Sequence, residues 1–92
     1  MADNRTQELA AVFRAAGSAH HDAFSQTDGD DPEWPLWYAE YLQEPLGKLF
    51  NTGFTRSELV YLLLSAEKDR QAEHSAPAWP EYYARFFRER YG

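Results

Sequence analysis

The residues best suited to chemistry are two adjacent histidines, His20 and His21, which have acids close by in the sequence. An imidazole beside a carboxylate is the usual arrangement for general acid–base catalysis, although one histidine with nearby acids is a common combination. His20 falls on the apolar side of a predicted helix. It is therefore either a buried histidine that only satisfies its own hydrogen bonds or a functional imidazole that faces a cleft. The acids that could orient it are Asp22, Asp28 and Glu40.

Metal binding is not predicted from these residues. Adjacent side chains on a helix point about 100° apart, so His20 and His21 cannot easily bind one ion. A calcium loop that begins at Asp28 would have Pro32 and Glu33 where an oxygen ligand and a glycine are needed. The chain also lacks cysteine, a nucleophile motif, a phosphate-binding glycine loop and a dinucleotide fingerprint. We therefore expect neither a metal nor a cofactor.

Aromatic side chains follow the acids in the stretch "EWPLWYAEYL", which contains Trp34, Trp37, Tyr38 and Tyr41. Ring faces and carboxylates both attract organic cations, so these residues could form an aromatic cage. A hydrophobic core needs the same helical spacing, and this spacing favours the core. The candidate ligand-binding or partner-binding residues are His20, His21, Asp22, Asp28, Trp34, Trp37 and Tyr38.

An aromatic sequence motif occurs twice in the chain: the stretch "DPEWPLWYAEYLQE" is followed later by the similar stretch "APAWPEYYARFFRE". At an offset of 45 residues, Trp34 and Tyr38 match Trp79 and Tyr83. The upstream stretches "SAHHDA" and "SAEKDR" match more weakly, at an offset of 47 residues. The repeat predicts two similar helical hairpins that are related by a pseudo-twofold axis.

The elements that must position these residues are predicted to be helices only. Apolar residues recur at helical spacing, which gives four helices near 5–24, 32–46, 56–73 and 78–91 and no sheet. A chain of 92 residues has the length of one domain. The prediction is an all-α, single helical domain over 1–92, with hairpin one at about 5–46 and hairpin two at about 55–91.

Three local signals set the expected helix boundaries. Asp31 is predicted to cap the second helix, with Pro32 at its first helical position. Pro45 is expected to kink or stop that helix. Thr55 and Glu58 have the spacing of a capping box, which predicts the start of the third helix.

The charge of the chain is acidic, with fifteen acids against nine bases, a formal charge of −6 and a pI near 4.9. This is the wrong sign for a nucleic-acid surface. Between Arg14 and Lys48 there are seven acids and no Lys or Arg, which indicates either a solvated face or a docking face for a basic partner or a cation. No signal peptide or membrane-spanning run is evident, so we expect a soluble, cytoplasmic protein without membrane or nucleic-acid partners.

The stretch "AHHDAF" followed by "TDGDDPEWPLWYAEYL" resembles a group of small, stand-alone bacterial proteins of unknown function. These share an Ala-His-His stretch followed by Asp-x-x-Trp-Pro-x-Trp-Tyr-Ala, and the resemblance covers roughly residues 15–46. It implies a helical, cytoplasmic protein and supplies no chemistry. The residues to which it directs attention are His20, His21, Asp28, Trp34, Pro35, Trp37 and Tyr38.

Two classes of function are consistent with the sequence. A protein–protein interaction module with an acidic, aromatic-rich face is favoured, because no convincing set of catalytic groups is evident. The alternative is a small-ligand-binding protein or enzyme that uses His20 beside the Trp34, Trp37 and Tyr38 cluster. An enclosed, solvent-connected cavity reached by His20 and Trp37 would favour the alternative, whereas a flat or fully packed surface there would favour the module.

The expected partner is another protein or a second copy of this chain. Aromatic residues make up 16% of the sequence, more than four short helices are expected to enclose. Part of the face formed by Tyr82, Phe86, Phe87 and Tyr91 is therefore expected to stay exposed, and a symmetric homodimer would cover it.

Overall fold

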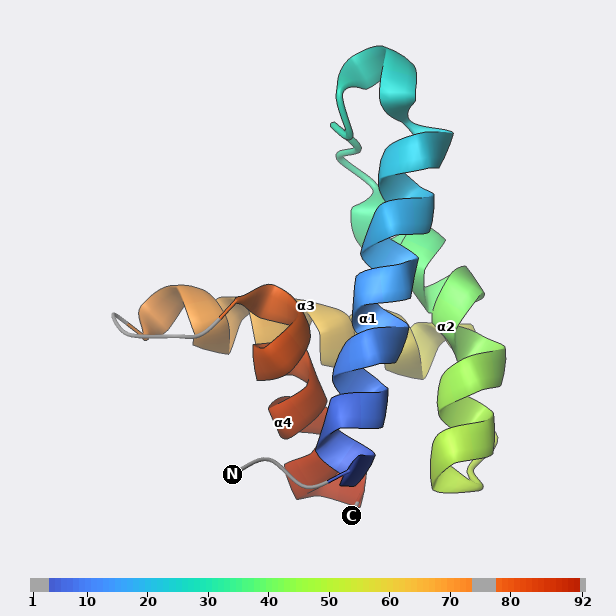
Figure 1. Ribbon diagram of the computed structural model, residues 1–92, viewed down its shortest axis with the longest axis vertical. Coiled ribbons are helices and arrows are strands. Elements are labelled where there is room, and N and C mark those ends of the chain that lie inside the picture. Colours follow the sequence, from blue (N-terminus) through green and yellow to red (C-terminus); the bar gives the residue numbers. More distant parts are fainter. Residues whose placement is uncertain (1–3, 74–77, 92) are drawn as a thin grey trace.

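The computed structural model describes residues 4–73 and 78–91, and all of the regular secondary structure within those ranges is helical. The elements are α1 (Asn4–Ala23), the short 3₁₀ helix η1 (Ser25–Thr27), α2 (Trp34–Phe50), α3 (Arg56–Ala72) and α4 (Trp79–Tyr91) (Figure 1). The four α-helices and the all-α fold class predicted from the sequence are confirmed.

The helices pack in a pattern that reflects the sequence repeat. The most extensive packing joins α1 with α4 and α2 with α3, while α1–α2 and α3–α4 contacts are smaller. In Figure 1, α1 and α2 follow the long axis of the molecule and α3 crosses behind α1. Exchanging the two halves of the chain replaces α1 with α3 and α2 with α4. The α1–α4 pair then becomes the α3–α2 pair, so the packing has the symmetry that a pseudo-twofold arrangement requires. Each helix nevertheless packs mainly against a helix of the other hairpin.

Aromatic rings join α1 to α4 in the centre of the molecule. Phe13 of α1 is completely buried. Its ring centroid lies 6.2 Å from that of Trp79, 5.7 Å from that of Tyr83 and 5.5 Å from that of Phe87. Such tilted and edge-to-face contacts are the favoured arrangements of aromatic pairs. The leucines that complete the core without exposure are Leu9, Leu42, Leu46 and Leu59.

Helix α2 continues past Pro45 and ends at Phe50, so the stop expected at this proline is wrong. A proline inside a helix costs about 3 kcal/mol. Continuing the helix buries Leu46 and Phe50, and each fully buried apolar side chain of this size contributes roughly 1.5 to 3 kcal/mol. Burial therefore outweighs the lost backbone hydrogen bond. The helix finally ends where Asn51 adopts a left-handed conformation with φ of 52°.

The predicted cap at Asp31 is also wrong, because α2 begins at Trp34 with Glu33 as its N-cap residue. Oδ1 of Asp31 accepts a hydrogen bond from the Glu33 N–H at 3.0 Å, and Oδ2 of the same carboxylate lies against His20. The capping box of α3 is confirmed. Thr55 Oγ1 accepts from the Glu58 N–H and Glu58 Oε1 accepts from the Thr55 N–H, each at 3.0 Å.

The aromatic face of α4 is more buried than the sequence suggested. Tyr82, Phe86 and Phe87 are buried, and only Tyr91 of the four expected residues stays exposed, at 37%. This reduces the apolar surface on which the expected homodimer was based. No helix in the described part of the chain is long and apolar enough to cross a membrane.

Candidate functional site

A pocket of about 390 Å³ lies where the two halves of the molecule meet. Four aromatic side chains line it, and they are the matching pairs of the sequence repeat: Trp34 with Trp79, and Tyr38 with Tyr83. The ring centroids of Tyr38 and Trp79 lie 5.8 Å apart, so rings from both halves touch across it. The repeat therefore supplies the aromatic walls of one shared pocket.

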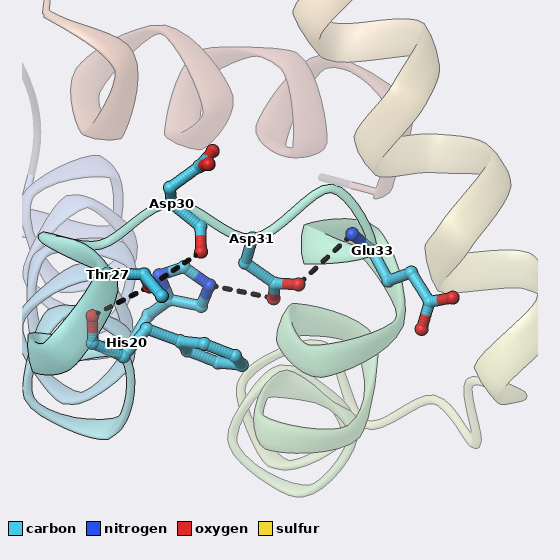
Figure 2. A network of polar contacts seen from close by, with 6 residues as sticks. His20, Thr27, Asp30, Asp31 and Glu33 are labelled. Atoms are coloured by element: carbon cyan, nitrogen blue, oxygen red, sulfur yellow. Dashed lines mark hydrogen bonds and ion pairs between the residues drawn. The ribbon is translucent and has the colours of Figure 1, made fainter.

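His20 lines the same pocket and is a buried polar residue, only 6% exposed. Its Nε2 atom lies 3.0 Å from Oδ2 of Asp31, and both side chains are only 8% exposed (Figure 2). The imidazole is stacked on Tyr38 at 4.9 Å and meets the edge of Trp37 at 5.0 Å. These contacts hold the ring in one orientation. His20 is thus both buried and part of a pocket wall. From the sequence, a buried histidine and an imidazole that faces a cleft were alternative interpretations.

The turn after α1 brings Asp31 back to His20. Its backbone reverses at Gly29, whose φ of +82° favours glycine. The Gly29 N–H donates to the Phe24 carbonyl at 2.9 Å. The Thr27 hydroxyl lies 3.1 Å from the Phe24 carbonyl oxygen and 2.9 Å from that of Asp30, so it ties the two ends of the turn together (Figure 2). The turn chemistry of this acidic stretch therefore positions the carboxylate that pairs with His20.

The acid that orients His20 is Asp31, not one of the three proposed from the sequence. Asp22, Asp28 and Glu40 are all exposed. Asp31 was assigned instead to a helix cap. Asp31 could have been identified as the first residue of the Asp-x-x-Trp-Pro motif, which follows the turn after His20.

The predicted site residues separate into two groups in the structure. His20, Trp34 and Tyr38 line the pocket. Trp37 meets His20 edge to face and stacks on Tyr41, with centroids 5.4 Å apart and an interplanar angle of 14°. It does not line the pocket, so of His20 and Trp37 only His20 reaches it. The candidates that lie on the surface outside the pocket lining are His21, Asp22 and Asp28.

The second half of the molecule contributes a polar cluster that sequence reasoning missed. Glu67 accepts hydrogen bonds from the Tyr83 hydroxyl at 2.7 Å, from Arg70 Nε and a terminal Arg70 nitrogen at 3.0 and 2.8 Å, and from Gln71 at 2.9 Å. All four side chains line the pocket. At the weak offset of 47 residues Glu67 matches His20, which was the available signal.

Burial and neighbouring charges shift the pKa values of three pocket residues. Burial acts to raise the pKa of Glu67, but the hydrogen bonds from Arg70, Tyr83 and Gln71 outweigh it and the pKa is lowered. Burial raises the pKa of Tyr83, and its hydrogen bond to Glu67 raises it further. Burial and then the charge of Asp31 raise the pKa of Tyr38. Both tyrosine hydroxyls therefore face an environment that disfavours added negative charge.

A close approach between α1 and α4 depends on Gly17. A Cβ atom at this position would lie 2.8 Å from Cζ2 of Trp79, closer than real Cβ atoms come to other heavy atoms. The absence of a side chain thus leaves room for the Trp79 indole against α1. Since glycine is unfavourable inside a helix, this contact gives a physical reason for its presence.

No group of three or more His, Cys, Asp or Glu side chains is arranged to hold a metal ion within residues 4–73 and 78–91. No protein-family model, no curated protein and no solved structure matches this chain. The chemistry of the pocket is therefore the basis on which a function can be proposed.

Proposed function

We propose that this protein binds a small organic molecule in the pocket between its two halves. The observation that carries the proposal is the convergence of four aromatic rings with polar side chains from both halves on one space of about 390 Å³. Small-molecule sites are typically concave, have volumes of roughly 300 to 1,000 Å³ and combine apolar walls with a few placed polar groups. The volume of this pocket lies within that range, and its lining combines four aromatic rings with polar and charged side chains.

The polar groups are held in place before any ligand arrives. His20 is fixed by Asp31 and by the rings around it, and Glu67 is fixed by Tyr83 and Arg70. A site whose side chains are already ordered loses less entropy when it binds a ligand. The order of these side chains therefore supports ligand binding at the pocket.

Binding is favoured over catalysis by the composition of the lining. Among the described residues that line the pocket, none is a serine, threonine or cysteine. The His20–Asp31 pair therefore has no such side chain within the lining to activate as a nucleophile. We propose a ligand-binding protein rather than an enzyme on this basis.

The test uses the three tryptophans of the chain as built-in probes. Trp34 and Trp79 line the pocket, while Trp37 lies outside its lining. A library of small cationic, neutral and anionic molecules is screened at millimolar concentration, and the indole N–H signals are followed by NMR. We expect binders to shift the signals of Trp34 and Trp79 more than that of Trp37. The proposal is wrong if no molecule of any charge does so.

A matched variant strengthens this screen. Trp34→Leu removes one wall of the pocket, and the partly exposed position of this side chain makes the change tolerable for folding. Leu36→Ala changes an exposed residue of the same helix that does not line the pocket. We expect the first variant to weaken binding of any library hit at least tenfold and the second to leave it unchanged.

A protein partner, or a second copy of this chain, is a second candidate. Exposed apolar side chains support it, since Tyr61 of α3 is 69% exposed and Leu64 of α3 and Leu36 of α2 are also exposed. The acidic segment between Arg14 and Lys48 supports a basic partner. A clean monomer near 10.7 kDa in sedimentation would contradict self-association.

We also propose a cytoplasmic location, supported by the absence of cysteine.

A further inference from the structure

The charges around the pocket are unequal. Asp30, Asp31 and Glu67 line it, whereas Arg70 is the only Lys or Arg among its described lining residues. Three carboxylates against one guanidinium leave a net negative charge there even when His20 is protonated. Such a pocket attracts positive groups and repels negative ones.

Arg70 is already engaged and is a poor receptor for an anionic ligand. Its Nε and one terminal nitrogen donate to the two oxygens of Glu67, at 3.0 and 2.8 Å. This forked arrangement uses the face of the guanidinium with which arginine usually binds carboxylates and phosphates. An anion would therefore have to compete with Glu67 for it.

Asp30 is the carboxylate that remains available to a ligand. Asp31 is held by His20 and by the Glu33 N–H, and Glu67 is held by Tyr83, Arg70 and Gln71. Within the described residues, no ion pair engages the Asp30 carboxylate. Figure 2 shows it turned away from the His20–Asp31 pair.

We propose that the ligand of this pocket is a small organic cation, bound by its ammonium group against the rings of Trp34 and Trp79 with Asp30 as counter-ion. The inference rests on the proposed ligand-binding function and names its ligand class. Aromatic faces and carboxylates attract a cation by separate electrostatic effects, and indole is the most favourable ring. The pocket is larger than an ammonium group, so it has room for an attached organic part.

Two further properties of the pocket agree with this ligand class. Burial is the largest cause of the raised pKa values of Tyr38 and Tyr83, and the negative charges of Asp31 and of Glu67 add to it, so a carboxylate lies near each hydroxyl. A bare metal ion is a poorer fit, because the described His, Asp and Glu side chains form no cluster of three that could hold one.

The test compares cations with neutral molecules of the same shape. Choline is paired with 3,3-dimethylbutan-1-ol, and benzylamine with benzyl alcohol, and each is titrated while the indole signals of Trp34 and Trp79 are followed. We expect at least one cation to bind about tenfold more tightly than its neutral partner, a difference of about 1.4 kcal/mol. Added salt should weaken binding of the cation more than that of the neutral molecule.

Two variants that each remove one negative charge test whether Asp30 is the carboxylate that binds the cation. Asp30→Asn removes the available carboxylate of the pocket, while Asp22→Asn removes an exposed carboxylate outside its lining. We expect the affinity for the cation to fall about threefold to tenfold in the first variant and to stay at the wild-type value in the second. Equal losses in both variants would overturn the role of Asp30.

The outcomes separate this inference from the proposed function. If neutral or anionic molecules shift the signals of Trp34 and Trp79 and the cations do not, the pocket binds ligands but the inferred ligand class is wrong. If no molecule of any charge shifts them, the proposed function itself fails, and with it the inference.

Discussion

The two halves of the molecule place the same aromatic frame around different polar groups. In the first half, His20 stacks on the ring of Tyr38 and pairs with Asp31, which lies eleven residues away across a turn. In the second half, Glu67 accepts a hydrogen bond from the Tyr83 hydroxyl and pairs with Arg70 of its own helix. The position that matches His20 thus carries an acid.

This difference teaches that the repeat constrains packing more tightly than it constrains polar contacts. The tryptophan and tyrosine of each half must fill the same space, so the matched positions keep their residue types. The polar group beside each tyrosine needs only some partner that satisfies it. One half uses a loop acid and the other uses a neighbour one helical turn away, which makes the first arrangement dependent on tertiary structure and the second largely local.

The largest expected effect comes from breaking the buried pair of the first half. His20→Ala removes the imidazole that pairs with Oδ2 of the buried Asp31 carboxylate and opens a cavity beside Tyr38. We expect the free energy of unfolding to fall by about 3 kcal/mol. Urea denaturation followed by circular dichroism measures it. The adjacent, exposed His21 is the matched control, and His21→Ala should change stability by less than about 0.5 kcal/mol. Similar small losses in both would show that the His20–Asp31 pair contributes little.

A smaller effect is expected from the two matching tyrosine hydroxyls. Tyr83→Phe removes a hydrogen bond of 2.7 Å to the charged Glu67, which should lower the free energy of unfolding by about 1.5 kcal/mol. No hydrogen bond holds the Tyr38 hydroxyl within the part of the chain that the structure describes. Tyr38→Phe should therefore cost less than about 0.5 kcal/mol in the same measurement. Equal costs would mean that the two halves do not differ in the way their tyrosines are held.

The smallest effect should appear in the dependence of stability on pH. The pKa of Glu67 is lower in the folded protein than its ordinary value of 4.5, because hydrogen bonds stabilise its ionised form. Its contribution to stability is therefore present above about pH 4.5 and is lost as the pH falls through the folded-state pKa. Unfolding free energies measured between pH 7 and pH 3 should fall less steeply for Glu67→Gln than for the wild type.

A control for this titration is available in the α3 capping box. Glu58 also has a lowered pKa, because it accepts hydrogen bonds from Thr55, so it contributes in the same pH range. Glu58→Gln separates the two contributions, and the double variant should show the shallowest pH dependence. An unchanged slope for Glu67→Gln would show that the hydrogen bonds to its carboxylate do not favour the ionised form.

Local signals in the sequence were sufficient for most of the fold. The apolar spacing in each segment predicted the helices, and the Thr55–Glu58 capping box fixed the start of α3. The stop expected at Pro45 failed because continuing the helix buries Leu46 and Phe50, which depends on tertiary packing: α2 packs on α3, and the Phe50 ring contacts Tyr91 of α4. A local rule describes the cost of the proline but not the tertiary contacts that outweigh it.

The candidate site was only half predictable for the same reason. His20, Trp34 and Tyr38 stood out by residue type and spacing, and they do line the pocket. Asp31 and Glu67 did not stand out, since an acid in an acid-rich segment and an acid on a polar helix look like ordinary surface residues.

By itself the sequence determined four helices, their approximate ends and the aromatic repeat, because these follow from backbone geometry and from neighbours within a few residues. Tertiary structure alone decided that α1 packs on α4, that Trp34 and Trp79 face one pocket although 45 residues separate them, and that Asp31 pairs with His20. These outcomes depend on how rings fill shared space and on which buried polar atoms find partners. Both are properties of side chains that meet only after the chain has folded.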